Sequence, residues 1–135
     1  MKEWARAASV DVVLLLDTSF LVELETEIAE RRSGPAVQFL AARWLEQTAI
    51  SIVSVAEFAE GFEDMTEVEP FLSRFRIVSL SRDIAYKTAA MQRNLPQRLG
   101  ENDAWIAATA LAYGATLAGR ERAFERVPRL RYAAI

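Results

Sequence analysis

A short apolar run near the start of the chain limits the folds open to it. Residues 12–16 read VVLLL, and Asp17, Thr18 and Ser19 follow directly. A run this short, rich in Val and Leu and closed by turn-forming residues, predicts a strand buried on both faces, as in the interior of parallel sheets. Ligands of open α/β sheets bind in the crevice beyond the strand ends. Asp17 is therefore either a helix cap or part of a site.

Further short apolar runs follow, with helical patterns between them. The other predicted strands are 49–53, 76–80, 115–119 and 131–135. Apolar residues at helical spacing predict helices over 19–32, 33–48, 54–62, 67–75 with a start near Pro70, 81–95 and 101–114. Ser81 is a typical first cap, and Gly114 stands where a C-terminal cap is expected. Strands that alternate with helices predict an α/β fold with a parallel sheet and right-handed crossovers.

The amino-acid composition limits the kinds of catalytic and metal site that the chain can form. The 135 residues are 52% hydrophobic, which fits one compact domain over residues 1–135. The chain has no Cys and no His, so disulfide frameworks, zinc fingers, thiol nucleophiles and Ser-His-Asp triads are excluded. Any catalysis must use carboxylates, hydroxyls, Lys, Arg or a metal bound through oxygen.

Charge and hydropathy bear on location and partners. The net charge is −3, so the chain lacks the overall basic character of proteins that bind nucleic acid by bulk electrostatics, although local patches remain open. No apolar segment approaches the roughly 20 residues that span a bilayer, and the first residues lack the apolar block of a signal peptide. We expect a cytoplasmic protein without a membrane partner.

Four acids fall where this fold can bring them together: Asp17, Glu57, Asp103 and Glu121. Each also has a simpler explanation. Asp17 can cap the next helix. Glu57 follows Ser54 at the spacing of a capping box. Asp103 stands in a first helical turn, where it complements the helix dipole.

The fourth acid, Glu121, is flanked by Arg120 and Arg122 and is also explained as an exposed ion-pair partner. The joint placement favours a site, because several strand ends of a parallel sheet converge on one crevice. Crowded carboxylates repel one another, and a divalent cation removes that cost. Oxygen ligands without His or Cys indicate a hard ion, Mg²⁺ or Mn²⁺.

Four stretches resemble the PIN-domain family, and most closely its VapC-type toxins. They are LLLDTSFLVEL with Asp17, SIVSVAEFAEG with Glu57, RLGENDAWIAATAL with Asp103, and LAGRERAFERVPRLR with Glu121. They stand in the family's order from Val12 to the C-terminus, and the third is the most specific. The resemblance implies a PIN-like fold, a five-stranded parallel sheet with helices on both faces, and metal-dependent cleavage of RNA. Residues 1–10 form an extension that it does not explain.

A mechanistic hypothesis follows from these residues. Asp17 and Asp103 would hold one or two Mg²⁺ or Mn²⁺ ions, with Glu57 and Glu121 contributing directly or through water. Thr18, Ser19 and Asn102 are expected to orient these groups, while Ser19 also suits a helix cap and Asn102 an exposed first-turn position. Phosphate contacts are expected from cations of the late helix and loops, which are Lys87, Arg93, Arg98, Arg120 and Arg122.

The chain departs from the family around the fourth acid. Members usually read Thr-Arg-Asp or Thr-Arg-Asn and then an acid before Phe, whereas this chain has Gly119, Arg120, Glu121 and then Ala123 before Phe124. The acid is longer, and its supporting hydroxyl is absent. A catalytically weakened module that binds RNA or protein therefore stays open as an alternative.

An aspartyl-phosphate mechanism is a lesser alternative, because Asp17 is a strand-end acid followed by Thr18. Phosphatases of that kind have a second Asp where this chain has Ser19, and receivers need a late strand-end Lys, yet Lys2 and Lys87 are the only lysines.

Partners are implied by the resemblance. Residues 20–45 carry more apolar side chains than one helix face of a small domain needs, including Trp44 and Leu45. Part of this surface is expected in the core, and part is expected to receive a helix of a VapB-like antitoxin. A homodimer is likewise implied by the family.

Overall fold

The computed structural model describes residues 12–135, and the predicted extension at residues 1–10 lies outside them. Five strands form one sheet in the order β3-β2-β1-β4-β5, and each neighbouring pair is parallel. The strands are β1 (Leu14–Leu16), β2 (Thr48–Ser51), β3 (Arg76–Val78), β4 (Thr116–Gly119) and β5 (Tyr132–Ala134). The predicted α/β fold with a five-stranded parallel sheet is confirmed.

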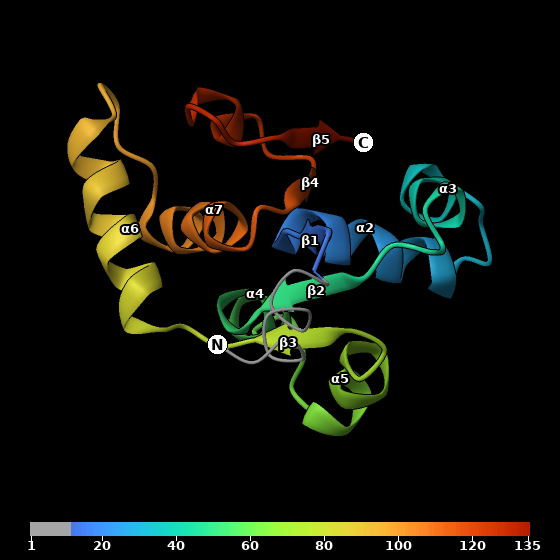
Figure 1. Cartoon of the computed structure of the whole chain (residues 1–135). Coiled ribbons are helices and arrows are strands. Elements are labelled where there is room, and N and C mark those ends of the chain that lie inside the picture. Colours follow the sequence, from blue (N-terminus) through green and yellow to red (C-terminus); the bar gives the residue numbers. More distant parts are fainter. Residues whose placement is uncertain (1–11) are drawn as a thin grey trace, which may run out of the picture.

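Helices cover both faces of the sheet, with α6 and α7 on one side and α2, α3 and α5 on the other (Figure 1). Their bounds are α2 (Thr18–Ala29), α3 (Pro35–Ala42), α4 (Ile52–Ala59), α5 (Met65–Leu72), α6 (Arg82–Asn94) and α7 (Glu101–Tyr113), and a 3-10 helix, η1 (Arg122–Arg126), follows β4. The alternation along β1 explains the two layers. Leu15 packs with the α7 side and Leu16 with the α2 side, because successive side chains of a strand point to opposite faces.

Two predicted helix boundaries are confirmed. The Ser81 side chain accepts a hydrogen bond from the Ile84 N–H and caps α6. Gly114 ends α7 with φ 64°, a left-handed conformation that favours glycine.

The boundary between β2 and α4 differs from the prediction. The strand ends at Ser51, whose side chain accepts from the Val53 N–H and caps α4. Ile52 and Val53 are therefore helical rather than the end of a strand, since a hydroxyl at position 51 satisfies a free N–H of the first turn. Ser54 is buried inside α4, so the capping-box explanation of Glu57 is wrong.

Other boundaries also shift. Helix α5 begins after Asp64, which caps it, and it contains Pro70 in its second half instead of starting there. Helix α3 ends at Ala42, short of the predicted residue 48. The 3-10 helix η1 was not predicted, because its charged sequence RAFER has no apolar periodicity.

The start of α3 is capped from a distance. Its N-cap residue is Gly34, which has no side chain to cap with. The buried Glu27 side chain on α2 instead accepts hydrogen bonds from the N–H groups of Ala36 and Val37, both at 2.9 Å. This carboxylate ties the end of α2 to the start of α3.

No helix within residues 12–135 is both long enough and apolar enough to cross a membrane.

Candidate active site

The candidate site lies at the carboxyl edge of the sheet, where β1 is flanked by β2 and β4. Asp17 follows β1 directly, and Glu121 comes two residues after β4. Glu57 lies in α4, which begins where β2 ends and packs against α2 and α7. Asp103 stands in the first turn of α7. All four predicted acids are brought to one edge, because parallel strands end on the same side of a sheet.

Asp17 is almost fully buried, at 2% exposure. Its Oδ1 accepts hydrogen bonds from the Phe20 N–H at 2.8 Å and from the Ser19 hydroxyl at 2.6 Å. Burial raises the pKa of Asp17, as does the charge of Glu121, while these hydrogen bonds and one from Tyr132 act to lower it. Asp17 thus caps α2 and also lies near Glu121 and Asp103.

Ser19 does not cap α2, contrary to the expectation, because Asp17 occupies that position. The Ser19 hydroxyl donates to Asp17 and accepts from the Arg120 N–H at 2.8 Å. It therefore connects the acid after β1 with the loop after β4.

Tyr132 was not predicted as part of the site. Its hydroxyl donates to Asp17 Oδ2 at 2.9 Å and accepts from the Glu121 N–H at 2.8 Å. Burial and the neighbouring charge of Asp17 raise the pKa of Tyr132, so the hydroxyl keeps its proton and remains a donor. A tyrosine in a short terminal strand has no sequence signal that distinguishes it from a core residue.

Glu57 is held by two of the predicted supporting residues. The Thr18 hydroxyl donates to Glu57 Oε1 at 2.5 Å, and the Asn102 side-chain amide donates to Oε2 at 3.0 Å. Thr18 also lies 3.2 Å from the Ser54 hydroxyl. Residues from α2 and α7 therefore fix the position of this carboxylate on α4.

The pKa of Asp103 is affected by burial and by the neighbouring acids. Burial and the charges of Glu121, Glu57 and Asp17, in that order, raise the pKa of Asp103 to about 6, while Arg126 acts to lower it. Each of the other three predicted acids thus acts on Asp103. A carboxylate with a pKa this far above its usual value indicates like charges close by in a partly buried place.

Glu121 is exposed and caps η1, because its Oε1 accepts from the Ala123 N–H at 3.1 Å. Its explanation as an ion-pair partner of the flanking arginines is wrong for Arg120, which instead pairs with Glu23 at 2.8 Å. Arg120, predicted to contact RNA, is therefore already engaged with α2.

Two other predicted RNA contacts, Arg93 and Arg98, lie together. They line a hollow of about 650 Å³ that also includes Glu101 and Trp105, so it adjoins the helix turn that carries Asp103. Trp105 is half-buried there.

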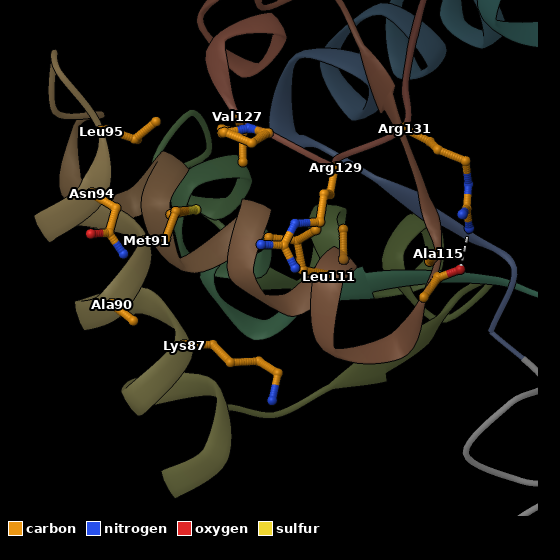
Figure 2. A pocket seen from close by; sticks show the side chains of 13 residues that line it. Lys87, Ala90, Met91, Asn94, Leu95, Leu111, Ala115, Val127, Arg129 and Arg131 are labelled. Carbon is orange, nitrogen blue, oxygen red and sulfur yellow. Dashed lines mark hydrogen bonds between the residues drawn. The ribbon is translucent and has the colours of Figure 1, made fainter.

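A second hollow, of about 540 Å³, lies between α6, α7 and residues 127–131 (Figure 2). Its lining includes Lys87, Arg129 and Ala115, and Ala115 immediately precedes β4. This hollow is therefore at the opposite edge of the sheet from the acids. Lys87 pairs there with Asp83 at 2.9 Å and does not join the predicted site.

The donor set fits a hard divalent cation. The four acids supply only oxygen ligands, and burial together with the charges of the other three raises the pKa of Asp103, an effect that a cation would oppose. Within residues 12–135, no three of the side chains that could act as ligands form a ready-made cage. Mg²⁺ commonly takes one or two carboxylates and keeps several waters, so a complete protein cage is not required.

Comparisons with known proteins agree with this architecture. Residues 14–130 match the sequence profile of the PIN domain. No curated protein sequence matches the chain. A chain in a toxin–antitoxin complex from Klebsiella pneumoniae is 32% identical with a TM-score of 0.64, over 81% of this chain and 87% of that one.

Other solved structures share the fold at lower identity. A chain of VapBC2 from Rickettsia felis, bound to a DNA fragment from its promoter, is 24% identical with a TM-score of 0.74. A chain of DNA-bound VapBC from Salmonella typhimurium is 22% identical with a TM-score of 0.71. Both matches cover 91% of this chain and 98% of the other.

Proposed function

Because this chain belongs to the PIN-domain family, we propose that it is a metal-dependent endoribonuclease and the toxin of a VapBC-type toxin–antitoxin pair. The observation that carries the proposal is the crowding of four carboxylates, from four separate segments, at one edge of the sheet. Burial and the charges of the other three raise the pKa of the fourth, Asp103. An arrangement that costs stability in this way is expected where the charges are needed.

Asp17 and Asp103 would hold the cation, with Glu57 and Glu121 contributing directly or through water. When bound, Mg²⁺ or Mn²⁺ supplies charge that polarises the RNA phosphodiester and acidifies the water that attacks phosphorus. The protein's part is to present the carboxylates in fixed positions. Ser19 orients Asp17, so the acid does not have to be ordered when the cation arrives.

Glu57 is presented in the same way. Thr18 and Asn102 donate to its two oxygens, which leaves the remaining lone pairs of a carboxylate for water or cation. Hydrogen-bonded partners of this kind orient ligands and influence metal affinity.

The RNA backbone would be bound by arginines, which contact phosphates without reading sequence. Arg93 and Arg98 are exposed beside the hollow next to Asp103. Arg120 lies beside Asp17 through Ser19, but its pairing with Glu23 means that a phosphate has to share or displace that carboxylate.

The test is cleavage of RNA in Mn²⁺ by the wild type, Asp17→Asn and Asp103→Asn. We expect at least a roughly 100-fold loss in both variants, since each removes a proposed ligand. Asp83→Asn is the matched control, because Asp83 stands in the first turn of α6 as Asp103 does in α7, yet it is exposed and paired with Lys87. Its cleavage rate should stay within about two-fold.

The outcomes separate the alternatives. Undiminished cleavage in Asp17→Asn or Asp103→Asn would reject the nuclease. Wild-type protein that neither binds Mn²⁺ nor cleaves RNA would favour a module that only binds RNA or protein, which the exposed Glu121 and the Gly119-Arg120-Glu121 segment keep open. A phosphoryl-transfer role has less support, because a receiver needs a lysine at a late strand end, and Lys87 lines the hollow at the opposite edge of the sheet.

A VapB-like antitoxin is the proposed protein partner. Of the apolar residues between 20 and 45, Phe20 and Leu21 are buried in the core, whereas Val22, Trp44 and Leu45 are 52%, 77% and 76% exposed. Exposed apolar anchors on and after helices are what an amphipathic helix would bind. Trp44→Ser is expected to weaken binding of a VapB-like antitoxin by at least about ten-fold without changing RNA cleavage. The proposed homodimer is tested by sedimentation of the isolated chain.

A further inference from the structure

We propose that Tyr132 is the positioning residue for Asp17, and that Gly119 provides the space that lets the two meet. The proposal rests on the proposed function, in that Asp17 is taken as a cation ligand. It adds a residue from the last strand to a site otherwise built from the segments after β1, β2 and β4 and from the first turn of α7.

The contact joins two distant parts of the chain. The Tyr132 hydroxyl donates to Asp17 Oδ2 at 2.9 Å and accepts from the Glu121 N–H at 2.8 Å. One hydroxyl therefore connects an acid after β1 with the backbone of the acid after β4. The tyrosine ring is itself fixed, since it packs against Phe124 with ring centroids 5.3 Å apart.

Tyr132 holds the Asp17 oxygen that receives no hydrogen bond from α2. Both Oδ1 donors, Ser19 and the Phe20 N–H, come from the first turn of α2. Tyr132 is the hydrogen-bond donor to Oδ2 among residues 12–135. With both oxygens held, the carboxylate plane cannot rotate freely. Without the tyrosine hydroxyl, only Oδ1, which caps α2, remains held by hydrogen bonds.

Gly119 is necessary for this geometry. A Cβ at position 119 would lie 1.9 Å from Asp17 Oδ2 and 2.0 Å from Oδ1. The Asp17 carboxylate therefore lies directly against the backbone of β4, where any side chain would displace it. Because the Asp side chain is short, moving its carboxylate away from such a Cβ would also break the hydrogen bond from Tyr132.

The experiment compares Tyr132→Phe, Gly119→Ala and the double variant. Tyr132→Phe keeps the ring and removes only the hydroxyl. Tyr86→Phe is the matched control, because Tyr86 is 67% exposed on α6, outside the cluster of acids. Melting temperatures verify that each variant is folded.

The first measurement needs neither metal nor RNA. At one fixed pH, the ¹³C signal of the Asp17 side-chain carboxyl is recorded by NMR in metal-free protein. We expect it to move in Tyr132→Phe and not in Tyr86→Phe. In the Gly119→Ala background, removal of the hydroxyl should have little further effect, because the carboxylate has already left Tyr132. An unmoved signal in Tyr132→Phe would overturn the proposal, whatever the enzyme does.

The second measurement concerns the cation and the reaction. Tyr132→Phe should weaken Mn²⁺ binding, followed by electron paramagnetic resonance, about 10- to 100-fold. It should lower kcat for RNA cleavage by a similar factor while KM changes less than about three-fold. A moved NMR signal with unchanged Mn²⁺ affinity and kcat would overturn the positioning role. A different outcome is that the wild type neither binds Mn²⁺ nor cleaves RNA, while the Asp17 signal still moves in Tyr132→Phe. That outcome would reject the proposed function and leave the Tyr132–Asp17 contact supported.

Discussion

At the scale of single residues, Asp103 links the charge of the site to stability. The pKa of Asp103 is raised from 3.8 to about 6 in the folded protein. An acid with a raised folded pKa stabilises the fold while it is protonated, below about pH 4. That contribution is lost as the pH rises through about 6. The ionised acid is therefore a net cost to the metal-free protein at neutral pH.

Asp103→Asn is accordingly expected to stabilise the metal-free protein at pH 7.5, by on the order of 1 kcal/mol, although it removes a proposed ligand. The benefit over the wild type should shrink as the pH falls from about 7 to about 4. Urea unfolding in EDTA at several pH values measures it. A variant less stable than the wild type at pH 7.5 would contradict the crowding of charge described above.

The acids of the candidate site could be located from the sequence, but the groups that hold them could not. Asp17 and Glu57 could be found because they follow apolar runs that end at one sheet edge. Tyr132 and Gly119 could not, because their importance comes from the pairing of β4 with β5 and the close approach of Asp17 to that backbone. Such distances depend on packing, which has no local pattern.

At the scale of elements, the junction of α2 and α3 depends on one buried carboxylate. Glu27 accepts from two N–H groups at the start of α3. Glu27→Gln is expected to lower the free energy of unfolding by about 1–3 kcal/mol, because an amide nitrogen cannot accept from the second N–H. Urea unfolding at neutral pH measures the difference from the wild type.

Glu30→Gln is the matched control for this change of charge. Glu30 stands at the C-terminal end of the same helix, but its side chain is exposed and pairs with Arg32 on the surface. Exposed pairs of this kind contribute little to stability, so the control should unfold close to the wild type. Equal stability of Glu27→Gln and Glu30→Gln would show that the distant cap contributes nothing.

Element types could be predicted from periodicity, while several boundaries could not. Ser51 and Ser54 both stand near the start of α4, and only the structure shows that Ser51 caps it. The sequence AISIV is equally apolar on both sides of that boundary. Pro70 suggested a helix start by residue type, yet Asp64 provides the cap and α5 accommodates the proline inside.

At the scale of the whole molecule, a bound cation should stabilise the fold. A ligand that binds only the folded state at about 100 times its Kd adds about 2.7 kcal/mol. We expect Mn²⁺ to raise the Tm of the wild type, and to do so more strongly at pH 7.5 than at pH 5, because protons compete for Asp103 with its pKa of about 6. Differential scanning fluorimetry with EDTA reversal measures this. An equal shift in Asp103→Asn would place the ion elsewhere.

The overall architecture was predictable because strands and helices alternate along the chain, and the order β3-β2-β1-β4-β5 then places the first strand at the centre. The position of the N-terminal acid between two other strand ends follows from that order. The strand order itself depends on long-range packing and was not predicted from the residues.

The carboxylate that starts α2 is the same one that the proposed chemistry requires. The two proposed ligands therefore differ in what their loss would do to the fold. Replacing Asp17 removes the cap of α2 and is expected to lower the stability of the fold. Replacing Asp103 relieves repulsion between carboxylates and is expected to leave the fold intact. A variant that lacks the proposed activity but stays folded should accordingly carry its substitution at Asp103 in α7, and not at Asp17.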